Sequence, residues 1–384
     1  MMLSHLYESA PGLEAALKNH TLLAEEATIW PLLRRFLLAH APSGGAALPG
    51  AISDTLAAVA NDLELGDRYM SRIGSTGNTG LWLGANKAAA DLVIVAHMDR
   101  PTFKVRSETD GILYPICANR FPSGRYEVAA KALRFDSGEL KAGARGRLIS
   151  DRQGGNDHLR FEATEGALCW RDLITMDVEP VLDGSTIRGT GLDNCLGVMT
   201  TLGAAAILRV IEPALIAANK RCLFVFSDQE EGNPESFFGH GAARLAHALP
   251  PPAIGCIVVD AQSTGDETNV TIGHGAAHGS VSAWGRGSVV PPNALALAAD
   301  LAAEVNAAHP DTVQLNTGYL SRSDDVALAR WAQVLAMIGP PMSNAHTGDE
   351  SASLADLPRS IRWLAHFVAA AIGLSDEIRQ QYQL

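Results

Sequence analysis

The sequence lacks the features that mark several large classes of protein. Its cysteines are odd in number, widely spaced and never paired as CxxC: Cys117, Cys169, Cys195, Cys222 and Cys256. This pattern disfavours a disulfide framework or a thiol metal site and indicates reduced cysteines. No apolar run reaches the roughly 18 residues that span a bilayer. The first residues have neither a basic segment nor a long apolar core, so we expect no signal peptide and a cytoplasmic location.

Positively charged residues are outnumbered by acids, and several common motifs are absent. The chain has 30 Lys and Arg against 42 Asp and Glu, a net charge of −12, so we expect no nucleic-acid partner and no membrane partner. There is no Gly-x-Ser-x-Gly elbow of a serine hydrolase. The Gly-rich turn at 74–80 lacks the Lys-Ser/Thr of a phosphate loop, and Gly189-Thr-Gly lacks the third glycine of a dinucleotide-binding loop.

The chain is long enough for about two to three domains. Apolar strand-like runs alternate with helical patterns before residue 103 and after residue 177, which predicts an α/β fold with a mixed sheet and helices on both faces. Between 104 and 176, short alternating runs separated by glycines predict an inserted β-rich domain. We therefore divide the chain into a discontinuous catalytic domain (1–103 and 177–384) and an insertion. The predicted helices span 22–40, interrupted at Pro31, and 51–63, 196–210, 235–248, 293–308, 325–331 and 353–372.

The stretch Arg188-Gly-Thr-Gly-Leu-Asp193 is the centre of the predicted site. It leaves a short β-like segment, turns on two glycines and opens an apolar helix, so that one carboxylate sits where the helix begins. Four other segments end in acids or histidines in the same way: His97-Met-Asp99, Glu230-Glu231, Asp260 and His346. Apolar strands ending in such residues present ligands at one edge of an α/β sheet. We interpret these five points as converging on a pair of metal ions that share Asp193.

Each of these pieces has an ordinary structural explanation when taken alone. A histidine ligand needs an acceptor for its second ring nitrogen, which Asp99 would supply to His97. In an adjacent pair such as Glu230-Glu231, one acid can bind metal while the other faces the substrate as a base, but such pairs are also common on exposed loops. Asp228 competes with this pair.

The histidines are equally open to a structural reading. His346 precedes Thr-Gly-Asp-Glu and could simply lead a helix capped by acids. His274 and His278 lie near the site segments and could touch substrate.

The order His-x-Asp, Leu-Asp-Asn, Gln-Glu-Glu-Gly, Val-Asp and Ile-Gly-x-Pro…His resembles the tetrahedral and glutamyl aminopeptidases, which are co-catalytic zinc metallopeptidases. The resemblance covers residues 50 to 372 and implies a zinc-exopeptidase-like fold with an inserted domain that serves in oligomerisation or as a lid. It implies two divalent metals, zinc or else cobalt or manganese: His97 and Asp260 would complete the first, and Glu231 and His346 the second. Asp193 would bridge them, Asp99 would orient His97, and Glu230 would be the general base.

The implied function is release of N-terminal amino acids from short peptides by a homo-oligomer, a dimer or a dodecamer. Three departures from the family bear on substrate preference: Arg100 and Thr102 after His-x-Asp, Gly232-Asn233-Pro234 after Glu-Glu, and Cys195 where the family often has arginine. The alternatives are an amide hydrolase of the same superfamily, such as a deacylase or a carboxypeptidase-like enzyme on a non-peptide substrate, and a non-catalytic relative.

Overall fold

The computed structural model describes residues 2–24, 26–117, 120–153, 156–232, 239–265, 268–282, 287–318 and 322–384. Its largest sheet has eight strands in the order β1-β2-β12-β3-β13-β17-β15-β16. Strands β12, β3, β13 and β17 run parallel to one another. Strand β2 is antiparallel to both of its neighbours, and β15 is antiparallel to β17 but parallel to β16. The mixed sheet predicted from the sequence is therefore confirmed. The strands are β1 (Tyr69–Met70), β2 (Thr79–Gly84), β3 (Leu92–His97), β12 (Arg221–Ser227), β13 (Gly255–Val259), β15 (Ala276–Gly279), β16 (Val313–Asn316) and β17 (Val334–Gly339).

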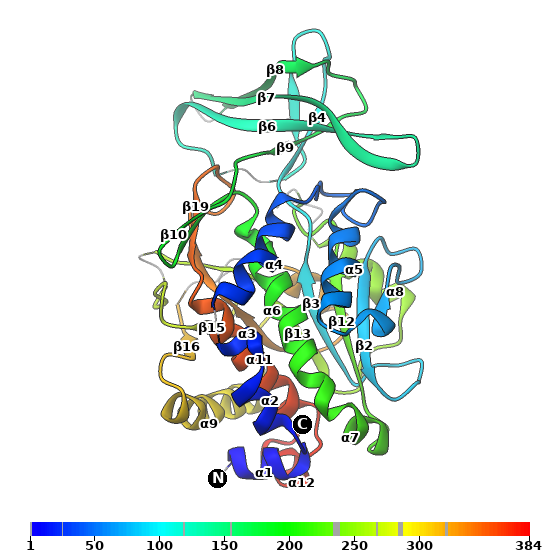
Figure 1. Ribbon diagram of the computed structural model, residues 1–384, viewed down its shortest axis with the longest axis vertical. Coiled ribbons are helices and arrows are strands. Elements are labelled where there is room, and N and C mark those ends of the chain that lie inside the picture. The colour runs from blue at the N-terminus through cyan, green and yellow to red at the C-terminus, as the bar shows by residue number, and fades with distance from the viewer. Residues whose placement is uncertain are drawn as a thin grey trace.

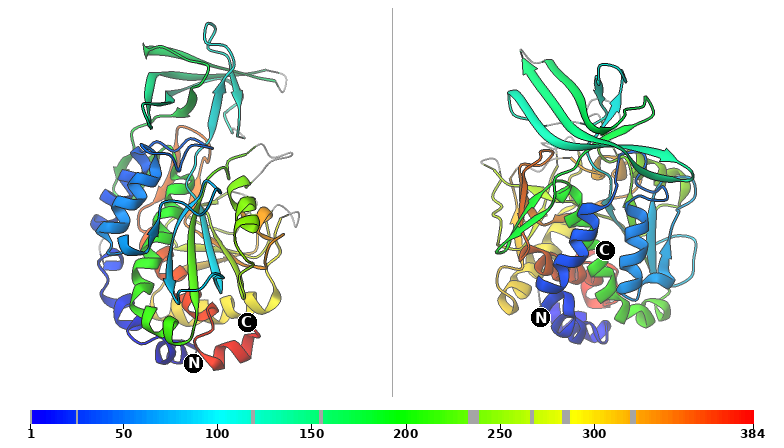
Figure 2. Two further views of the ribbon diagram at one scale, coloured as in Figure 1. Left: turned by 90° about the vertical axis from the view of Figure 1, so that its right-hand side faces the viewer. Right: turned by 45° about the horizontal axis from the view of Figure 1, so that its top comes forward.

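Helices cover both faces of this sheet, as expected. Helices α4 (Glu26–Leu38), α6 (Leu192–Leu208) and α11 (Asp356–Ala371) lie on one side, and α8 (His240–Ala248) lies on the other (Figure 2). Every residue of β3, β13 and β17 is buried. Burial on both faces explains why these strands are continuous apolar runs rather than alternating ones.

Helix α6 corrects one expectation. With the turns that follow it, the stretch Leu192–Ala217 is long and apolar enough by length and composition to cross a membrane, although the sequence reading found no such run. In the fold, 83% of its most apolar window is buried. Its apolar residues pack against α11, α4 and β3, so this helix is part of the protein core.

The remaining helices follow the predictions with shifted ends. The first predicted helix consists of α3 (Thr21–Ala24) and α4, and Pro31 lies inside α4 rather than interrupting it. Burial of Ile29, Leu33 and Phe36 on one face of α4 outweighs the missing N–H of the proline. Part of the helix expected at 235–248 lies outside the described residues, since 233–238 are not described. The others are α1 (Met2–Ser9), α2 (Leu13–Asn19), α5 (Ile52–Asp62), α7 (Glu212–Ala217), α9 (Pro292–Ala308), α10 (Asp325–Leu328) and α12 (Asp376–Tyr382).

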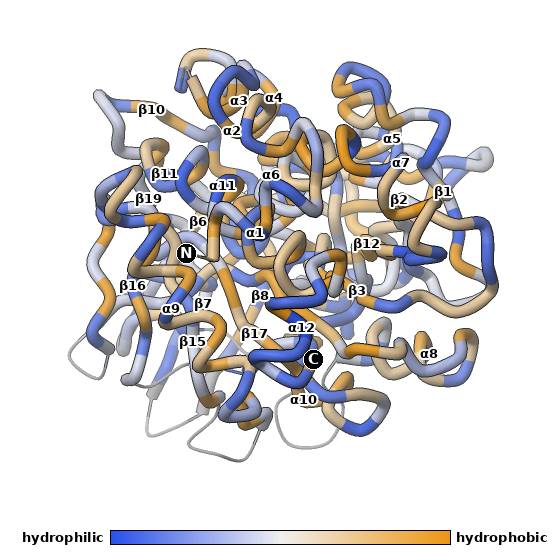
Figure 3. The backbone as a smooth tube through the Cα atoms, turned by 90° about the horizontal axis from the view of Figure 1, so that it is seen from below, coloured by the Kyte–Doolittle hydropathy of each residue, from blue (hydrophilic) through white to orange (hydrophobic). Residues whose placement is uncertain are grey.

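A second sheet stands over one end of the first (Figure 1). Its order is β5-β4-β9-β6-β7-β8, and its strands are β4 (Thr102–Val105), β5 (Leu113–Pro115), β6 (Gly124–Asp136), β7 (Glu139–Gln153), β8 (Asn156–Gly166) and β9 (Leu173–Met176). It has a hydrophobic core of its own, which includes Phe103, Leu148 and Phe161. We call it the inserted sheet; its role as a separate functional domain stays a prediction. Both chain termini lie at the opposite end of the molecule, which Figure 3 views directly.

A third, five-stranded sheet joins the segments that carry the predicted site. Its order is β10-β11-β19-β18-β14. Strand β11 (Thr186–Gly189) leads to Asp193, β14 (Gln262–Ser263) follows Asp260, and β18 (Pro341–Ser343) precedes His346. Strand β19 (Glu350–Ser353) pairs with both β11 and β18, and β10 (Val181–Asp183) forms the edge. These pairings fix the backbone around three of the predicted ligands.

Candidate metal centre

The parallel strands bring the predicted ligands to one edge of the main sheet. Strand β3 ends at His97, β12 ends just before the segment of Glu230 and Glu231, and β13 ends just before Asp260. Because neighbouring parallel strands end on the same side, these residues meet there. Asp193 comes to the same place from the first turn of α6. His346 arrives from the turn between β18 and β19.

The two histidines lie on opposite sides of Asp193. Its Oδ1 is 3.1 Å from Nε2 of His97, and its Oδ2 is 3.4 Å from Nε2 of His346. Nε2 of His97 also lies 3.3 Å from Oδ1 of Asp260 and 3.9 Å from Oε2 of Glu230. Nε2 of His346 lies 3.2 Å from Oε1 of Glu231. All five predicted ligands and the predicted base therefore gather around one carboxylate whose two oxygens face different imidazoles.

Unusual backbone conformations occur on the segments that carry these side chains. Gln229, directly before the glutamate pair, has φ 65°, and His346 has φ 64°. Few non-glycine residues adopt the left-handed region, and such residues cluster at functional sites. Gly191, with φ 79°, begins the turn to Asp193, where an added Cβ would meet Nε of Arg100 at 2.3 Å. Only glycine fits the chain this closely against that guanidinium.

Asp99 contacts both His97 and the glutamate pair. Its Oδ1 is 3.7 Å from Nδ1 of His97, whereas its backbone carbonyl lies only 3.2 Å from that nitrogen. The carboxylate instead accepts hydrogen bonds from the backbone N–H groups of Glu230 (3.1 Å) and Glu231 (3.2 Å). Asp99 thus orients His97 through its main chain and holds the glutamate pair through its side chain.

The sequence reading missed two further buried residues that hold the site. Asn194, joined to Asp193 by a cis peptide bond, donates to the carbonyl of Val259 and accepts from the N–H of Ala261, so it grips the chain on both sides of Asp260. Glu350 had been read only as one of the acids that cap a helix after His346. It is fully buried and accepts from the backbone N–H groups of Leu192 (2.7 Å) and His346 (3.0 Å). A side chain that binds a distant main chain leaves no pattern in the sequence.

Carboxyl groups are concentrated at the centre. Burial raises the pKa of Glu230 well above its usual value, and the carboxylates of Glu231 and Asp260 add to this rise against the opposing effect of His97. Burial also raises the pKa of Glu231 and of Asp260. Burial acts in the same direction on Asp193, but its contacts with His346 and His97 outweigh that effect and lower its pKa. Among the described residues of this centre, four carboxyl groups thus face only two histidines.

The donor set fits divalent metal ions. Donor atoms of His97, Glu230 and Asp260 lie within 4.8 Å of one another, and so do those of His97, Asp193 and Glu231. Oε1 of Glu231 and Oδ1 of Asp260 are buried without a hydrogen bond. Carboxylate and imidazole ligands suit zinc, cobalt and manganese. A cation would satisfy these oxygens and offset the excess acid, which is otherwise costly to bury.

Two of the three sequence departures contact each other. The buried guanidinium of Arg100 donates to the carbonyls of Phe36 (2.6 Å) and Leu37 (3.0 Å) at the end of α4, and it lies 3.3 Å from Sγ of Cys195. It therefore joins α4 to the first turn of α6, beneath the loop of Asp193. In the remaining departure, Gly232-Asn233-Pro234, residues Asn233 and Pro234 lie outside the described residues.

His274 and His278 are the two other histidines that could touch substrate. His278 is 1% exposed and packs between the rings of Trp363 and Phe367, where it accepts the Trp363 indole N–H at 3.2 Å. His274 is exposed and lies 3.6 Å from Asp311. The possibility that His278 touches substrate is not supported, because its burial among apolar rings makes it a core residue.

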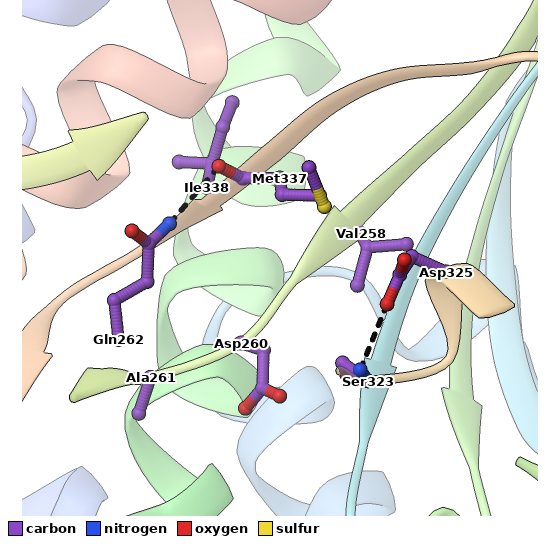
Figure 4. A pocket seen from close by; sticks show the side chains of 8 residues that line it. All are labelled: Val258, Asp260, Ala261, Gln262, Ser323, Asp325, Met337 and Ile338. Atoms are coloured by element: carbon purple, nitrogen blue, oxygen red, sulfur yellow. Dashed lines mark hydrogen bonds between the residues drawn. The ribbon is translucent and has the colours of Figure 1, made fainter. Parts of the chain in front are cut away.

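A small cavity lies beside Asp260, between β13 and β17 (Figure 4). Its volume of about 10 Å³ is roughly that of a single water site. Gln262 reaches back to the carbonyl of Met337 at 3.0 Å, and Asp325 accepts from the N–H of Ser323 at 2.8 Å. These bonds close the wall behind Asp260, so this cavity has no room for a substrate.

Comparison with known proteins identifies the family. The sequence pattern described as Peptidase family M20/M25/M40 matches residues 176–370, more than half of the chain. The chain belongs to this peptidase family. Among curated proteins there is no match.

Solved structures of aminopeptidases share the fold of this peptidase. A TET aminopeptidase from a marine sediment archaeon of the Thaumarchaeota is 15% identical with a TM-score of 0.70, covering 93% of this chain and 99% of that one. An aminopeptidase from the archaeon Desulfurococcus kamchatkensis is 18% identical with a TM-score of 0.65, covering 93% and 97%. The TET1 peptidase of Pyrococcus horikoshii, which assembles into a tetrahedron or a large octahedral shell, is 16% identical with a TM-score of 0.64, covering 88% and 98%. At these identities the likeness concerns the fold.

Proposed function

We propose that this peptidase is a dinuclear metallo-aminopeptidase that releases N-terminal amino acids from short peptides. The observation that carries the proposal is the position of Asp193, whose two carboxylate oxygens face His97 on one side and His346 on the other. A carboxylate placed in this way suits two metal ions that share it. His97 and Asp260 would complete one ion, and Glu231 and His346 the other.

The chain's own residues would then carry the chemistry. Bound divalent ions would supply Lewis-acid polarisation of the scissile carbonyl and a more acidic water. Glu230 would accept a proton from the attacking water and deliver it to the leaving amine. Asp99 would hold Glu230 and Glu231 in place through their backbone N–H groups.

A panel of substrates tests the proposal. Aminoacyl-p-nitroanilides, N-acyl amino acids and short peptides would be offered to protein loaded with zinc, cobalt or manganese, with the metal content measured in each sample. We expect turnover of substrates with a free α-amine and about two ions per chain. Turnover of N-acyl amino acids alone would point to a deacylase of the same superfamily. No turnover with metals bound would point to a non-catalytic relative.

The inserted sheet would make much of the contact in a cytoplasmic homo-oligomer, at least a dimer. Large hydrophobic side chains are exposed on it: Trp170 at 63%, Tyr114 at 50% and Phe135 at 46%. Strands β5 and β8 end its strand order, but they meet each other at a bridge between Ile112 and Arg160, so the exposed apolar side chains rather than open strand edges support this proposal. The assembly of the Pyrococcus horikoshii peptidase into closed shells agrees with this proposal.

A further inference from the structure

Glu350 ties together two segments that carry predicted metal ligands. Its side chain is fully buried four residues after His346. Oε1 accepts from the N–H of His346 at 3.0 Å. Oε2 accepts from the N–H of Leu192 at 2.7 Å and lies 3.4 Å from the N–H of Asp193. One carboxylate therefore binds the main chain of both residues whose side chains face each other across the centre.

These backbone groups need such an acceptor. The first N–H groups of a helix have no partner within the helix, and Leu192 and Asp193 begin α6. His346 has its backbone in the left-handed region, which few non-glycine residues adopt. A buried carboxylate that accepts from both segments fixes their separation, and with it the separation of the two side chains.

We propose that Glu350 is a positioning residue of the metal centre, which sets the distance between the bridging carboxylate of Asp193 and the imidazole of His346. The proposal rests on the dinuclear centre proposed above. Glu350 itself need not touch an ion or the substrate. Its effect should be largest on the ion proposed between Glu231 and His346, because one of its hydrogen bonds ends on the backbone of His346, whose imidazole faces Glu231.

Asp356 offers a matched comparison for a purely structural role. It is also fully buried and also accepts from two backbone N–H groups, those of Gly273 and Gly275, each at 2.7 Å. None of these residues carries a predicted ligand. Asp356→Asn thus alters the same kind of backbone hydrogen bonds away from the centre, together with a 3.8 Å ion pair to Arg359.

The experiment compares wild type, E350Q and D356N loaded with cobalt. The affinity for each ion comes from titration, the ligand geometry from the visible absorption of bound cobalt, and the fold from circular dichroism and thermal unfolding. The amide of E350Q must turn its NH₂ group toward one of the two segments. We expect one of the two ions to bind about 10- to 100-fold more weakly, with an altered cobalt spectrum, as is typical when a group that orients a ligand is lost. D356N should unfold at a lower temperature but keep both affinities and the spectrum.

The possible outcomes distinguish the role of Glu350 from the existence of the dinuclear centre. Two ions bound by E350Q with wild-type affinity and spectrum would overturn the role of Glu350 and leave the dinuclear centre intact. Wild type that binds no cobalt would overturn the dinuclear centre, and the role of Glu350 with it. If E350Q does not fold, E350D is measured instead: it keeps the charge but shortens the reach by one methylene. A folded E350D with the same selective loss of one ion supports the proposal, and an unchanged one overturns it.

Discussion

Buried charged side chains are paired differently at the end of the main sheet and at the inserted sheet. In the inserted sheet, Lys131 lies 2.9 Å from Asp177, and Asp172 lies 2.7 Å from Arg134. Each of these buried groups has a partner of opposite charge. At the end of the main sheet, four carboxylates share two imidazoles. Nε2 of His97 alone lies within 4 Å of Asp193, Glu230 and Asp260, so these acids do not each have a cationic partner of their own.

The difference separates charges that stabilise a fold from charges kept for another purpose. A paired buried charge is complete within the protein, whereas an unpaired one costs free energy until something else neutralises it. The surplus of acid is therefore the feature on which the proposed cation site rests, independently of any relative. The predictions below test this contrast, beginning with the largest expected effect.

Asp193→Ala should abolish the centre. Removing the carboxylate that faces both histidines takes one ligand from each ion, so we expect metal content to fall from about two ions per chain to below one, with loss of peptidase activity. Metal analysis of the purified protein measures this. Asp172→Ala in the inserted sheet is the control and should keep its metal. Equal metal content in both variants would break the contrast between the two regions.

Glu230→Gln should lower kcat by about 10²- to 10⁴-fold while metal stays bound. The amide keeps the size of the side chain but cannot accept a proton. Steady-state kinetics and metal analysis on the same sample distinguish two roles. Loss of metal would make Glu230 a ligand, grouped with His97 and Asp260, rather than the base. Nearly full activity would move the base elsewhere, with Asp228 as the next candidate.

Replacing 104–176 with a short Gly/Ser linker should reduce the size of the oligomer measured by light scattering. This deletion also removes Cys117, whose thiol donates to the carbonyl of Glu231, so a fall in activity would not by itself report on assembly. Trp170→Ser is the milder variant and should weaken association while preserving metal and turnover. An intact chain that is monomeric at micromolar concentration would contradict the proposed assembly, and an unchanged oligomer after deletion would place the contacts on the main sheet.

Asp172→Asn should lower the free energy of unfolding by about 2–3 kcal/mol, because the partly buried Arg134 loses a charged partner. Chemical denaturation measures the change. Metal affinity and kcat should stay at wild-type values, since this pair lies within the inserted sheet. A selective loss of metal would show that the two regions are coupled through this pair.

His278→Gln should flatten the dependence of stability on pH below neutrality. Burial lowers the pKa of His278 to about 3 in the folded protein, whereas an unfolded histidine titrates near 6.5. Between these values the unfolded chain binds one more proton, so stability is lost as pH falls, by about 1.4 kcal/mol per pH unit below 6.5. Denaturation at pH 7, 6 and 5.5 measures the slope for both proteins. Glutamine keeps an acceptor for the Trp363 N–H, and an unchanged slope would contradict the assignment.

The sequence predicts the site residues well where the direction of a strand determines their position. Apolar runs ending at His97, Glu231 and Asp260 are enough to predict a common edge, because parallel strands place their carboxyl ends together. Pro31 was misread because local preference yields to burial of one helix face. Glu350 and Asn194 were missed for another reason: their bonds run to main-chain groups far away in the sequence, and backbone partners carry no residue-specific signal.

The spacing of the ligands along the chain has a consequence for biosynthesis. His97 belongs to the first third of the sequence and His346 to its last tenth. A ribosome that has made the first four ligands still holds a centre without its final imidazole and without Glu350. Long-range contacts of this kind form late in folding. The proposed ion held by Glu231 and His346 would therefore be captured only after translation is nearly complete, so an unfinished chain would have no peptidase activity to release in the cell.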